Sequence, residues 1–303
     1  MIDFCGIPLA HRIVNGSGTF DAIAARRAFG DAIVEQFPFA AFVSKTVTLE
    51  PRQGNPPPRL WELPGGLMNS IGLPNKGLAG YLQEDLPQLA ELPVPLIVNV
   101  MGSAREDVAR LVAAFAEREE VSALELNVSC PNVKTGLIMG ADPRELAALL
   151  DHVRPHAGDK PLIVKLTPNC ASPAEVAAAA EQHGADALSL INTLRGMAMH
   201  PDRPAEPWLG GGTGGVSGPA VRAIALSQVR EVRARTELPI VGMGGVQSGR
   251  HAVDLHRAGA DLCAVGTESF RDPLAAARIA DEASMLDEAF PANAARGTEV
   301  VRL

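Results

Sequence analysis

The chain has 303 residues, of which 47% are hydrophobic and 20% are charged, as is ordinary for a soluble globular protein. Its net charge of −8 comes without any block of Lys or Arg, which argues against a nucleic-acid partner. No stretch reaches the roughly 18 apolar residues of a membrane span, and no signal peptide is recognisable at Met1. We therefore predict a cytoplasmic protein with no membrane segment.

The four cysteines, Cys5, Cys130, Cys170 and Cys263, are scattered and form no C-x-x-C pair. This spacing argues against a disulfide framework, a zinc site or an iron–sulfur cluster within the chain. We therefore expect no metal site, and we expect every cysteine except Cys130 to be apolar filling.

Short apolar runs rich in β-branched residues alternate with longer helical patterns along the whole chain. Runs of this length separated by helices predict buried parallel strands. The runs cover residues 12–15, 41–46, 95–101, 123–129, 161–166, 187–191, 239–243 and 262–265. Eight such units are what a TIM (β/α)8 barrel requires, so we predict an α/β fold with one barrel domain over residues 1–303.

Three helix starts support this alternation. Ser103-Ala-Arg-Glu106 matches a capping box, and Asp142-Pro143-Arg-Glu145 combines a cap with proline at the first helical position. Ser172-Pro173-Ala-Glu175 repeats that pattern. The predicted helices follow the third, fourth and fifth strands, as a barrel demands.

Two connections, at about 50–75 and 194–219, are long and rich in Gly or Pro. Long loops after barrel strands usually carry function, so we expect both to lie over the mouth of the barrel. The second contains Gly210-x-Gly212-x-x-Gly215, which formally matches a dinucleotide fingerprint. No strand precedes it, so the pattern predicts a flexible loop.

Polar residues stand at the carboxyl ends of the predicted strands, where barrel active sites form. A core strand has no packing reason to end in Lys or Asn, so together these ends predict a polar rim. They are Ser17, Lys45, Asn99, Asn127, Lys165 and Asn192. The last two strands end in glycine turns around Gly244, Gly245 and Gly266, which favour a phosphate site. The lysines then allow either a Schiff base with a carbonyl substrate or a positive charge beside a flavin.

The segment Asn127-Val-Ser-Cys130-Pro131-Asn132 places a thiol just past the fourth strand, between amide side chains. A thiol facing the mouth can act as a base or nucleophile once its pKa is lowered. This segment closely resembles the catalytic loop of class 1 dihydroorotate dehydrogenases, and Val133-Lys134-Thr135-Gly136 resembles the class 1B form. The resemblance extends over nearly the whole chain.

The matching motifs follow barrel order. They are Gly16-Ser17-Gly18-Thr19-Phe20, Ser44-Lys45-Thr46, Asn69-Ser-Ile-Gly-Leu-Pro-Asn75, Asn99-Val-Met-Gly102, Lys165-Leu-Thr-Pro-Asn169, Ile191-Asn-Thr-Leu-Arg-Gly-Met197, Gly214-Gly-Val-Ser-Gly-Pro219, Gly242-Met-Gly-Gly245 and Val265-Gly-Thr267.

The resemblance implies that FMN lies over the barrel mouth and that dihydroorotate lies against its ring. The implied phosphate ligands are Gly244, Gly245, Gly266 and Thr267. The rest of the cofactor would be lined by Ser17, Lys45, Thr46, Asn99, Asn127, Lys165, Ile191 and Gly218. The implied substrate contacts are Lys45, Asn69, Ser70, Ile71, Gly72, Leu73, Asn127, Asn192 and Thr193.

In the implied mechanism, Cys130 removes the proton at C5 of dihydroorotate while a hydride leaves C6 for the flavin. Lys165 would stabilise negative charge on the reduced flavin. The class 1B resemblance also implies a homodimer core with a separate subunit carrying FAD and a [2Fe–2S] cluster that passes electrons to NAD+. A stand-alone class 1A enzyme that uses fumarate is the alternative.

Two stretches depart from the family pattern: an insertion-like segment at 21–37, and residues 200–212, where His200 stands in place of an expected acidic residue. Both bear on the partner surface more than on catalysis. Three competing functions remain at this point. They are a dihydropyrimidine dehydrogenase-type flavoprotein, a Schiff-base aldolase using Lys165 or Lys45, and a flavin- or phosphate-binding barrel without turnover.

Overall fold

The structure, a computed structural model, describes residues 1–129 and 139–289. Its centre is an eight-stranded sheet in which each strand pairs in parallel with the next, in the order β3-β14-β13-β10-β9-β8-β7-β4. The outer strands β3 and β4 also contact each other, so the sheet closes into a barrel. The strands are β3 (Ile13–Asn15), β4 (Phe42–Val43), β7 (Leu96–Val100), β8 (Val121–Asn127), β9 (Leu162–Lys165), β10 (Ala187–Leu190), β13 (Ile240–Met243) and β14 (Leu262–Val265). All eight predicted strands and the TIM barrel are thereby confirmed.

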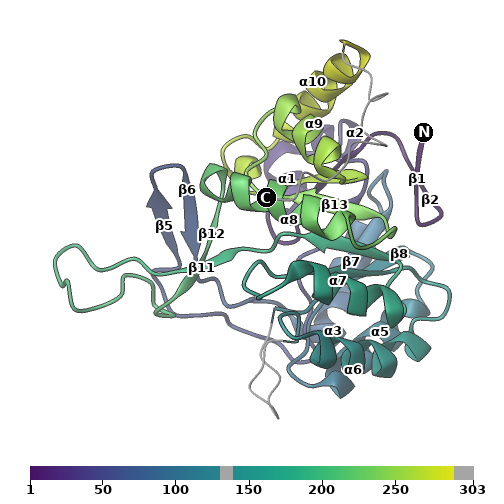
Figure 1. The fold of residues 1–303 in the computed structure, drawn as a ribbon, viewed down its shortest axis with the longest axis horizontal. Helices are drawn as coiled ribbons and strands as arrows, with labels where there is room; N and C mark the ends of the chain where they lie inside the picture. The colour runs from purple at the N-terminus through teal and green to yellow at the C-terminus, as the bar shows by residue number, and fades with distance from the viewer. Residues whose placement is uncertain (130–138, 290–303) are drawn as a thin grey trace.

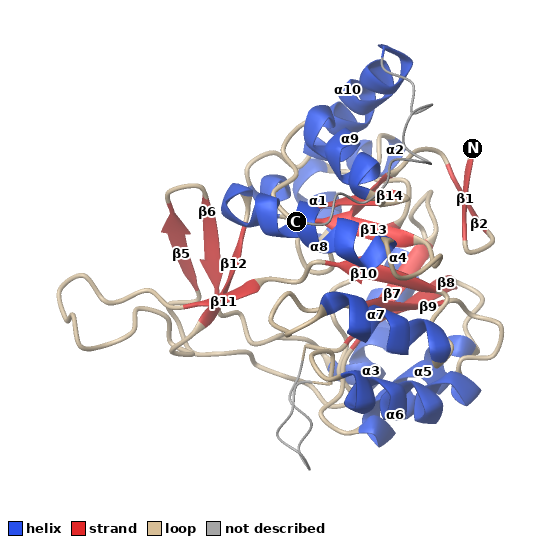
Figure 2. Ribbon diagram, viewed as in Figure 1, coloured by secondary structure: helices blue, strands red, loops and turns tan. Residues whose placement is uncertain are grey.

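Helices surround this sheet (Figures 1 and 2). From α5 to α10, each helix contacts the next one along the chain, as in the outer ring of a barrel. The helices are α1 (Ala22–Phe29), α2 (Ala32–Glu35), α3 (Gly77–Gly80), α4 (Leu86–Leu89), α5 (Arg105–Ala116), α6 (Pro143–Val153), α7 (Pro173–Gln182), α8 (Arg222–Arg233), α9 (Gly249–Ala258) and α10 (Ala275–Ala289). A π-helical turn (Tyr81–Asp85) joins α3 to α4, and short 3-10 segments cover Arg154–His156, Pro219–Val221 and Thr267–Phe270. None of the helices in the described ranges is long and apolar enough to cross a membrane.

Two of the three predicted helix caps are confirmed. Asp142 accepts hydrogen bonds from the backbone N–H groups of Arg144 and Glu145, and Ser172 accepts one from that of Glu175. The capping box predicted at Ser103 is wrong, because α5 begins at Arg105 and its N-cap position is held by Ala104 without a side-chain cap. Acidic residues in the first turn of α5 interact favourably with the helix dipole and reduce the need for that cap.

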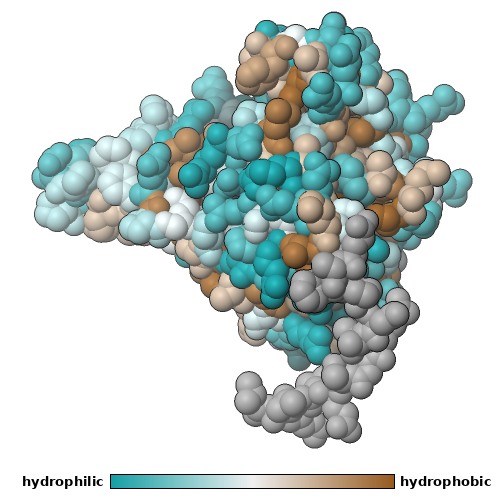
Figure 3. All heavy atoms as spheres, turned by 90° about the horizontal axis from the view of Figure 1, so that it is seen from above, coloured by the Kyte–Doolittle hydropathy of each residue, from teal (hydrophilic) through white to brown (hydrophobic). Residues whose placement is uncertain are grey.

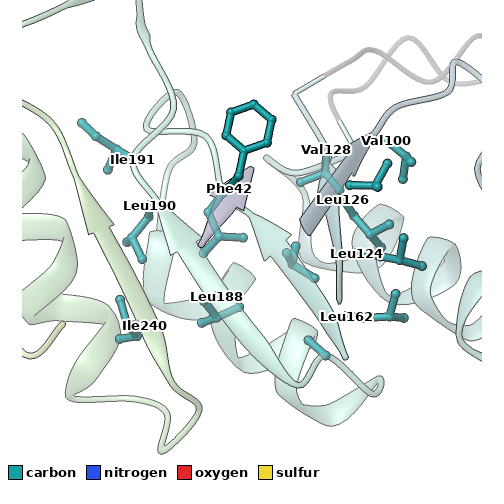
Figure 4. Close-up of a cluster of buried hydrophobic side chains, with 14 of the residues drawn as sticks. Phe42, Val100, Leu124, Leu126, Val128, Leu162, Leu188, Leu190, Ile191 and Ile240 are labelled. Carbon is teal, nitrogen blue, oxygen red and sulfur yellow. The ribbon is translucent and has the colours of Figure 1, made fainter. Parts of the chain in front are cut away.

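The apolar core has two parts, one on each face of the barrel sheet. The outer part fills the space between strands and helices, and Figure 4 shows some of it, including Leu124, Leu126 and Leu162. The inner part fills the barrel and includes side chains of the antiparallel hairpin β1 (Ile2–Phe4) and β2 (Ile7–Leu9). That hairpin packs with Ala187 and Leu262, the first residues of β10 and β14. The amino end of the barrel is therefore plugged, which leaves the carboxyl end for a site.

A side chain closes the barrel between β3 and β4. Asn15, which is 1% exposed, donates from Nδ2 to the backbone oxygen of Val43 at 2.8 Å and accepts at Oδ1 from the Val43 N–H at 2.7 Å. A single backbone bond, from Ala40 N–H to the oxygen of Ile13, accompanies this pair. A carboxamide offers one donor side and one acceptor side, so Asn15 takes the place of backbone hydrogen bonds between β3 and β4. We call this junction of β3 and β4 the seam.

The two long connections contain a second sheet that the sequence analysis missed. Its strands β11 (Leu194–Gly196), β12 (Gly214–Ser217), β6 (Gly66–Asn69) and β5 (Leu60–Leu63) are antiparallel neighbours in that order. They form the base of an arm that projects from the barrel in Figure 1. We use the name arm for the two long connections, about 50–75 and 194–219, taken together. Seen from above, the arm extends from a mainly hydrophilic face on which hydrophobic residues form small separate groups (Figure 3).

The prediction of a flexible glycine loop at 210–215 is wrong. Gly214 and Gly215 belong to β12, and the Gly210 N–H donates to the oxygen of Pro58. A side chain at Gly210 would lie 2.1 Å from the oxygen of Pro56. Glycine is needed here because two backbone segments approach closely.

We predict that Asn15→Leu lowers the free energy of unfolding by ~2–4 kcal/mol, because it leaves both backbone groups of Val43 buried without partners. Urea denaturation of the purified protein measures the change. Gln83→Leu, which replaces an exposed amide side chain, is the control and should stay within ~0.5 kcal/mol of the parent. Equal stability of the two variants would show that Asn15 does not hold the seam.

Candidate active site

The predicted polar residues lie at the open carboxyl end of the barrel. Asn99, Asn127 and Lys165 fall in the last two positions of β7, β8 and β9. Ser17, Lys45 and Asn192 lie two residues beyond β3, β4 and β10. Because parallel strands end at the same edge of a sheet, the six residues share one rim, as expected.

Asn127, Asn192 and Thr193 form one hydrogen-bonded group, which Thr193 joins through its backbone N–H. Asn192 Nδ2 lies 2.8 Å from Ser129 Oγ and 3.4 Å from Asn127 Oδ1, and Asn192 Oδ1 accepts from the Thr193 N–H at 2.9 Å. Asn169 fixes the same loop, because its Nδ2 donates to the oxygen of Thr193 at 3.0 Å. We call Asn127, Asn192 and Thr193 the amide cluster; such groups suit a planar ligand with both carbonyl and N–H edges.

The arm carries Asn69 to the amide cluster. Asn69 Nδ2 donates to the oxygen of Gly215 in β12 at 3.3 Å. Gly215 in turn lies so close to Thr193 that an added Cβ would come 2.0 Å from Thr193 Oγ1. The arm therefore positions residues from the 50–75 segment against the rim.

The next predicted substrate residues are held by Asn55. Asn55 Nδ2 donates to Ser70 Oγ at 2.9 Å, and the Asn55 N–H donates to the oxygen of Ile71. Gly72, with φ of 74°, leaves no room for a Cβ, which would lie 2.4 Å from the Asn55 nitrogen. Asn55 therefore shapes the loop from Ser70 to Leu73, and sequence reasoning did not single Asn55 out. Within the described residues, no hydrogen bond joins this loop to the amide cluster.

A wall lined by glycines, here called the glycine wall, lies on the other side of the rim. Gly244 and Gly245 have φ values of 134° and 70°, where a side chain is strained. A Cβ at Gly244 would lie 3.4 Å from Ile191, and one at Gly245 would lie 2.9 Å from the oxygen of Gly218. The structure therefore brings Ile191, Gly218, Gly244 and Gly245 together.

Gly266 and Thr267 complete this wall. Thr267 Oγ1 donates to Ser217 Oγ at 2.9 Å, and a Cβ at Gly218 would lie 3.5 Å from Thr267 Cγ2. Within the described residues, the N–H groups of Gly245 and Gly266 donate to no protein acceptor. Unpaired N–H groups beside glycine turns suit an anion such as a phosphate.

The strands at the seam continue the glycine wall, because β3 pairs directly with β14, the strand that leads into Gly266. Ser17 Oγ donates to the oxygen of Ser44 at 2.9 Å, and Thr46 is buried two residues further along the chain. The insertion-like stretch 21–37 forms α1 and α2. In the other unusual stretch, the His200 ring packs against that of Trp208 in the arm, with centroids 5.1 Å apart and planes tilted by 50°.

One buried group at the rim is ready for a ligand that donates a hydrogen bond. Asn99 is fully buried, and its Nδ2 donates to Glu125 Oε2 at 2.5 Å. Its Oδ1 is buried without a partner among the described residues. Buried acceptors are normally satisfied, so this oxygen fits a planar ring with an N–H group, as the glycine wall fits a phosphate.

Sequence reasoning missed Glu125, which is 3% exposed inside the barrel. Its other oxygen, Oε1, accepts from Ser189 Oγ at 2.7 Å. A carboxylate in the middle of an apolar strand was the available signal, since burying a charge is costly unless neighbouring groups satisfy it.

The two lysines of the rim differ in their surroundings. Lys45 is exposed, whereas Lys165 is 5% exposed inside the mouth. Neither takes part in an ion pair with a described residue. Both positive charges are therefore available to anionic groups of a ligand.

The predicted base, Cys130, lies outside the described residues. Burial raises the pKa of Cys5 to about 11 and that of Cys263 to about 12, and it also raises the pKa of Cys170. These three cysteines therefore stay as neutral thiols near pH 7. Among the residues described, no group of His, Cys, Asp and Glu could hold a metal ion.

Comparison with known proteins gives a consistent result. Residues 2–286 match the family model described as dihydroorotate dehydrogenase. The chain is 40% identical over 289 residues to the dihydroorotate dehydrogenase B (NAD+) catalytic subunit of Bacillus mycoides, covering 95% of this chain and 92% of that protein. It is 42% identical over 280 residues to the protein of the same name from Pelobacter propionicus, covering 92% and 90%. The chain therefore belongs to the dihydroorotate dehydrogenase family.

Proposed function

We propose that this chain oxidises dihydroorotate to orotate in pyrimidine biosynthesis, as the FMN-containing catalytic subunit of a class 1B enzyme. The observation that carries the proposal is the family match over residues 2–286, with similarity along almost the full length of relatives named as NAD+-linked catalytic subunits. The rim supports it independently, because it combines amides, two lysines and a glycine wall.

FMN is the flavin that these residues suit. The unpaired N–H groups of Gly245 and Gly266 would hold its phosphate, as the family resemblance implies for Gly244 and Thr267 as well. Asn99 Oδ1 would accept from the single N–H of the oxidised isoalloxazine ring. Lys165 would place a positive charge beside that ring. When bound, FMN supplies the acceptor for the hydride that leaves C6 of the substrate.

The substrate is a cyclic ureide that bears a carboxylate, and the rim offers groups for both parts. Asn69, Asn127 and Asn192 can each donate and accept, which suits the alternating N–H and C=O groups of the ureide. Lys45, exposed at the mouth, would pair with the carboxylate. Thr193 is held against this group through Asn169.

Oxidation removes a proton from C5 and a hydride from C6, and the double bond of orotate forms between these atoms. We assign the proton to the Cys130 thiolate, because C5 is α to a carbonyl and a base of moderate strength suffices. The Lys165 ammonium, buried in the mouth, would stabilise the negative charge that the flavin gains.

A carboxylate on the substrate separates this function from that of a dihydropyrimidine dehydrogenase, whose substrate lacks one. If Lys45 binds the carboxylate, dihydrouracil should reduce the flavin far more slowly than dihydroorotate. Comparable rates with the two substrates would favour the dihydropyrimidine reading.

Electron transfer onward requires a partner. We propose a homodimer core joined to a subunit that carries FAD and a [2Fe–2S] cluster and reduces NAD+. The relatives are named as catalytic subunits of an NAD+-linked enzyme, and the described part of the chain offers no cluster ligands. The cytoplasmic location stays a prediction.

We predict that Cys130→Ser retains FMN but slows anaerobic flavin reduction by dihydroorotate roughly 10²- to 10⁴-fold near neutral pH, because a hydroxyl is a much weaker base than a thiolate. Stopped-flow absorbance measures the rate. Cys170→Ser is the matched control and should reduce at the parent rate. A parent-like rate in Cys130→Ser would remove Cys130 from the mechanism.

Alkylation offers a second test of Cys130. Only thiolates react quickly with iodoacetamide, and raised pKa values keep Cys5, Cys170 and Cys263 protonated at pH 8. We therefore predict that Cys130 is modified first and that orotate slows its modification. Peptide mass spectrometry after timed quenching identifies the site, and faster labelling of any other cysteine would contradict the assignment.

The acceptor test separates class 1B from class 1A. We predict that the isolated chain, reduced by dihydroorotate, is not reoxidised by NAD+ until the FAD and iron–sulfur subunit is added. Absorbance of the flavin and of NADH follows both steps. Rapid reoxidation of the isolated chain by fumarate would assign it to class 1A instead.

A further inference from the structure

Glu125 is a buried carboxylate to which the reaction outlined above gives no task. It lies in β8, 3% exposed, and its hydrogen bonds reach strands on both sides. Oε2 accepts from Asn99 of β7 at 2.5 Å, and Oε1 accepts from Ser189 of β10 at 2.7 Å. Both donors are neutral side chains. They therefore stabilise the carboxylate by hydrogen bonds and not by an opposite charge.

The strand register places this carboxylate next to the proposed flavin site. Asn99 is the register partner of Glu125, and Lys165 is the register partner of Ser189. In β9, Glu125 is level with Ile163 and Ser189 is level with Lys165, so the Glu125–Ser189 bond crosses β9 between Ile163 and the buried lysine of the rim. Glu125 lies two residues before Asn127, the last residue of β8, so its carboxylate lies just inside the rim.

The bond to Glu125 decides which end of the Asn99 amide faces a ligand. A carboxylate only accepts hydrogen bonds, so the Asn99 Nδ2 must turn toward it. Oδ1 is then directed elsewhere, and it is the buried oxygen that has no partner among the described residues. Without Glu125, nothing in the network would prevent the amide from presenting its N–H2 group.

We propose that Glu125 is a positioning residue for the flavin: it fixes Asn99 so that Oδ1 accepts a hydrogen bond from the N3–H of the isoalloxazine ring. This inference rests on the proposed function, because it requires FMN at the mouth. It assigns Glu125 no contact with the substrate or the cofactor, and its effect is transmitted through Asn99 alone.

The test compares two replacements of Glu125 in the full-length protein after FMN removal. Glu125→Gln keeps an oxygen that can accept from Asn99, whereas Glu125→Met has similar length and no strong acceptor. We expect Glu125→Gln to bind FMN nearly as tightly as the parent, and Glu125→Met to bind it about tenfold more weakly, as loss of one oriented hydrogen bond predicts. Quenching of FMN fluorescence gives the Kd.

A flavin analogue separates orientation from general loosening of the site. N3-methyl FMN has no N3–H, so Glu125→Met should leave its Kd unchanged relative to the parent while weakening FMN. A structural defect would weaken the binding of FMN and of N3-methyl FMN equally. Gln83→Leu, which replaces an exposed amide side chain, is the control and should bind FMN like the parent.

Three results would overturn the inference: equal FMN affinity in Glu125→Met and the parent, equal losses in the Gln and Met variants, or equal weakening of FMN and N3-methyl FMN. If Glu125→Met does not fold, Asn99→Ala gives the same test, and parent-like FMN binding by that variant would also overturn it. Failure of the parent itself to bind FMN would refute the proposed function, whereas parent binding with no effect of Glu125 would refute this inference alone.

Discussion

The architecture depends on closing the barrel between its first two strands. Asn15 makes this closure by donating to and accepting from the backbone of Val43 while almost completely buried. The strands that meet there lead into Ser17 and Lys45, so the seam brings these residues onto the same rim as those that follow the other strands. If the seam opened, the rim would lose one wall of the proposed flavin site.

The rim combines two kinds of surface that different parts of a flavin and its substrate require. One side is built from glycine turns, where backbone N–H groups are accessible to an anion. The other side is built from carboxamides held by neighbouring hydrogen bonds, such as those between Asn192 and Ser129 and between Asn169 and Thr193. Fixed orientations matter because a carboxamide offers a donor at one end and an acceptor at the other. The arm contributes to this order by holding Asn69 against Gly215.

Much of the fold could be predicted from the sequence, because buried parallel strands are short apolar runs and each barrel strand gave one. Side chains at strand ends were also predictable, since parallel strands share an edge. The arm strands were missed: Gly214–Ser217 has little apolar pattern, and its pairing with Gly66–Asn69 depends on residues far away in the chain. The capping prediction at Ser103 failed because helix ends are decided by a local balance that a four-residue motif does not capture.

The residues that support the site were harder to predict than those that form it. Asn15, Asn55 and Glu125 act through hydrogen bonds to segments between 15 and 64 residues away in sequence, so no local pattern reveals them. Roles taken from the family resemblance, including that of Cys130, came from motifs and not from spacing or periodicity. The positions of the site residues at one rim were predictable, whereas the orientation of each amide side chain depends on its hydrogen-bond partners.

The most direct test of the central claim is an anaerobic titration of the purified flavin-containing protein with dihydroorotate, followed by flavin absorbance and by analysis of the product. The account predicts complete bleaching after one equivalent per flavin, with one equivalent of orotate formed. Flavin that stays oxidised in excess dihydroorotate, or bleaching without orotate, would contradict it.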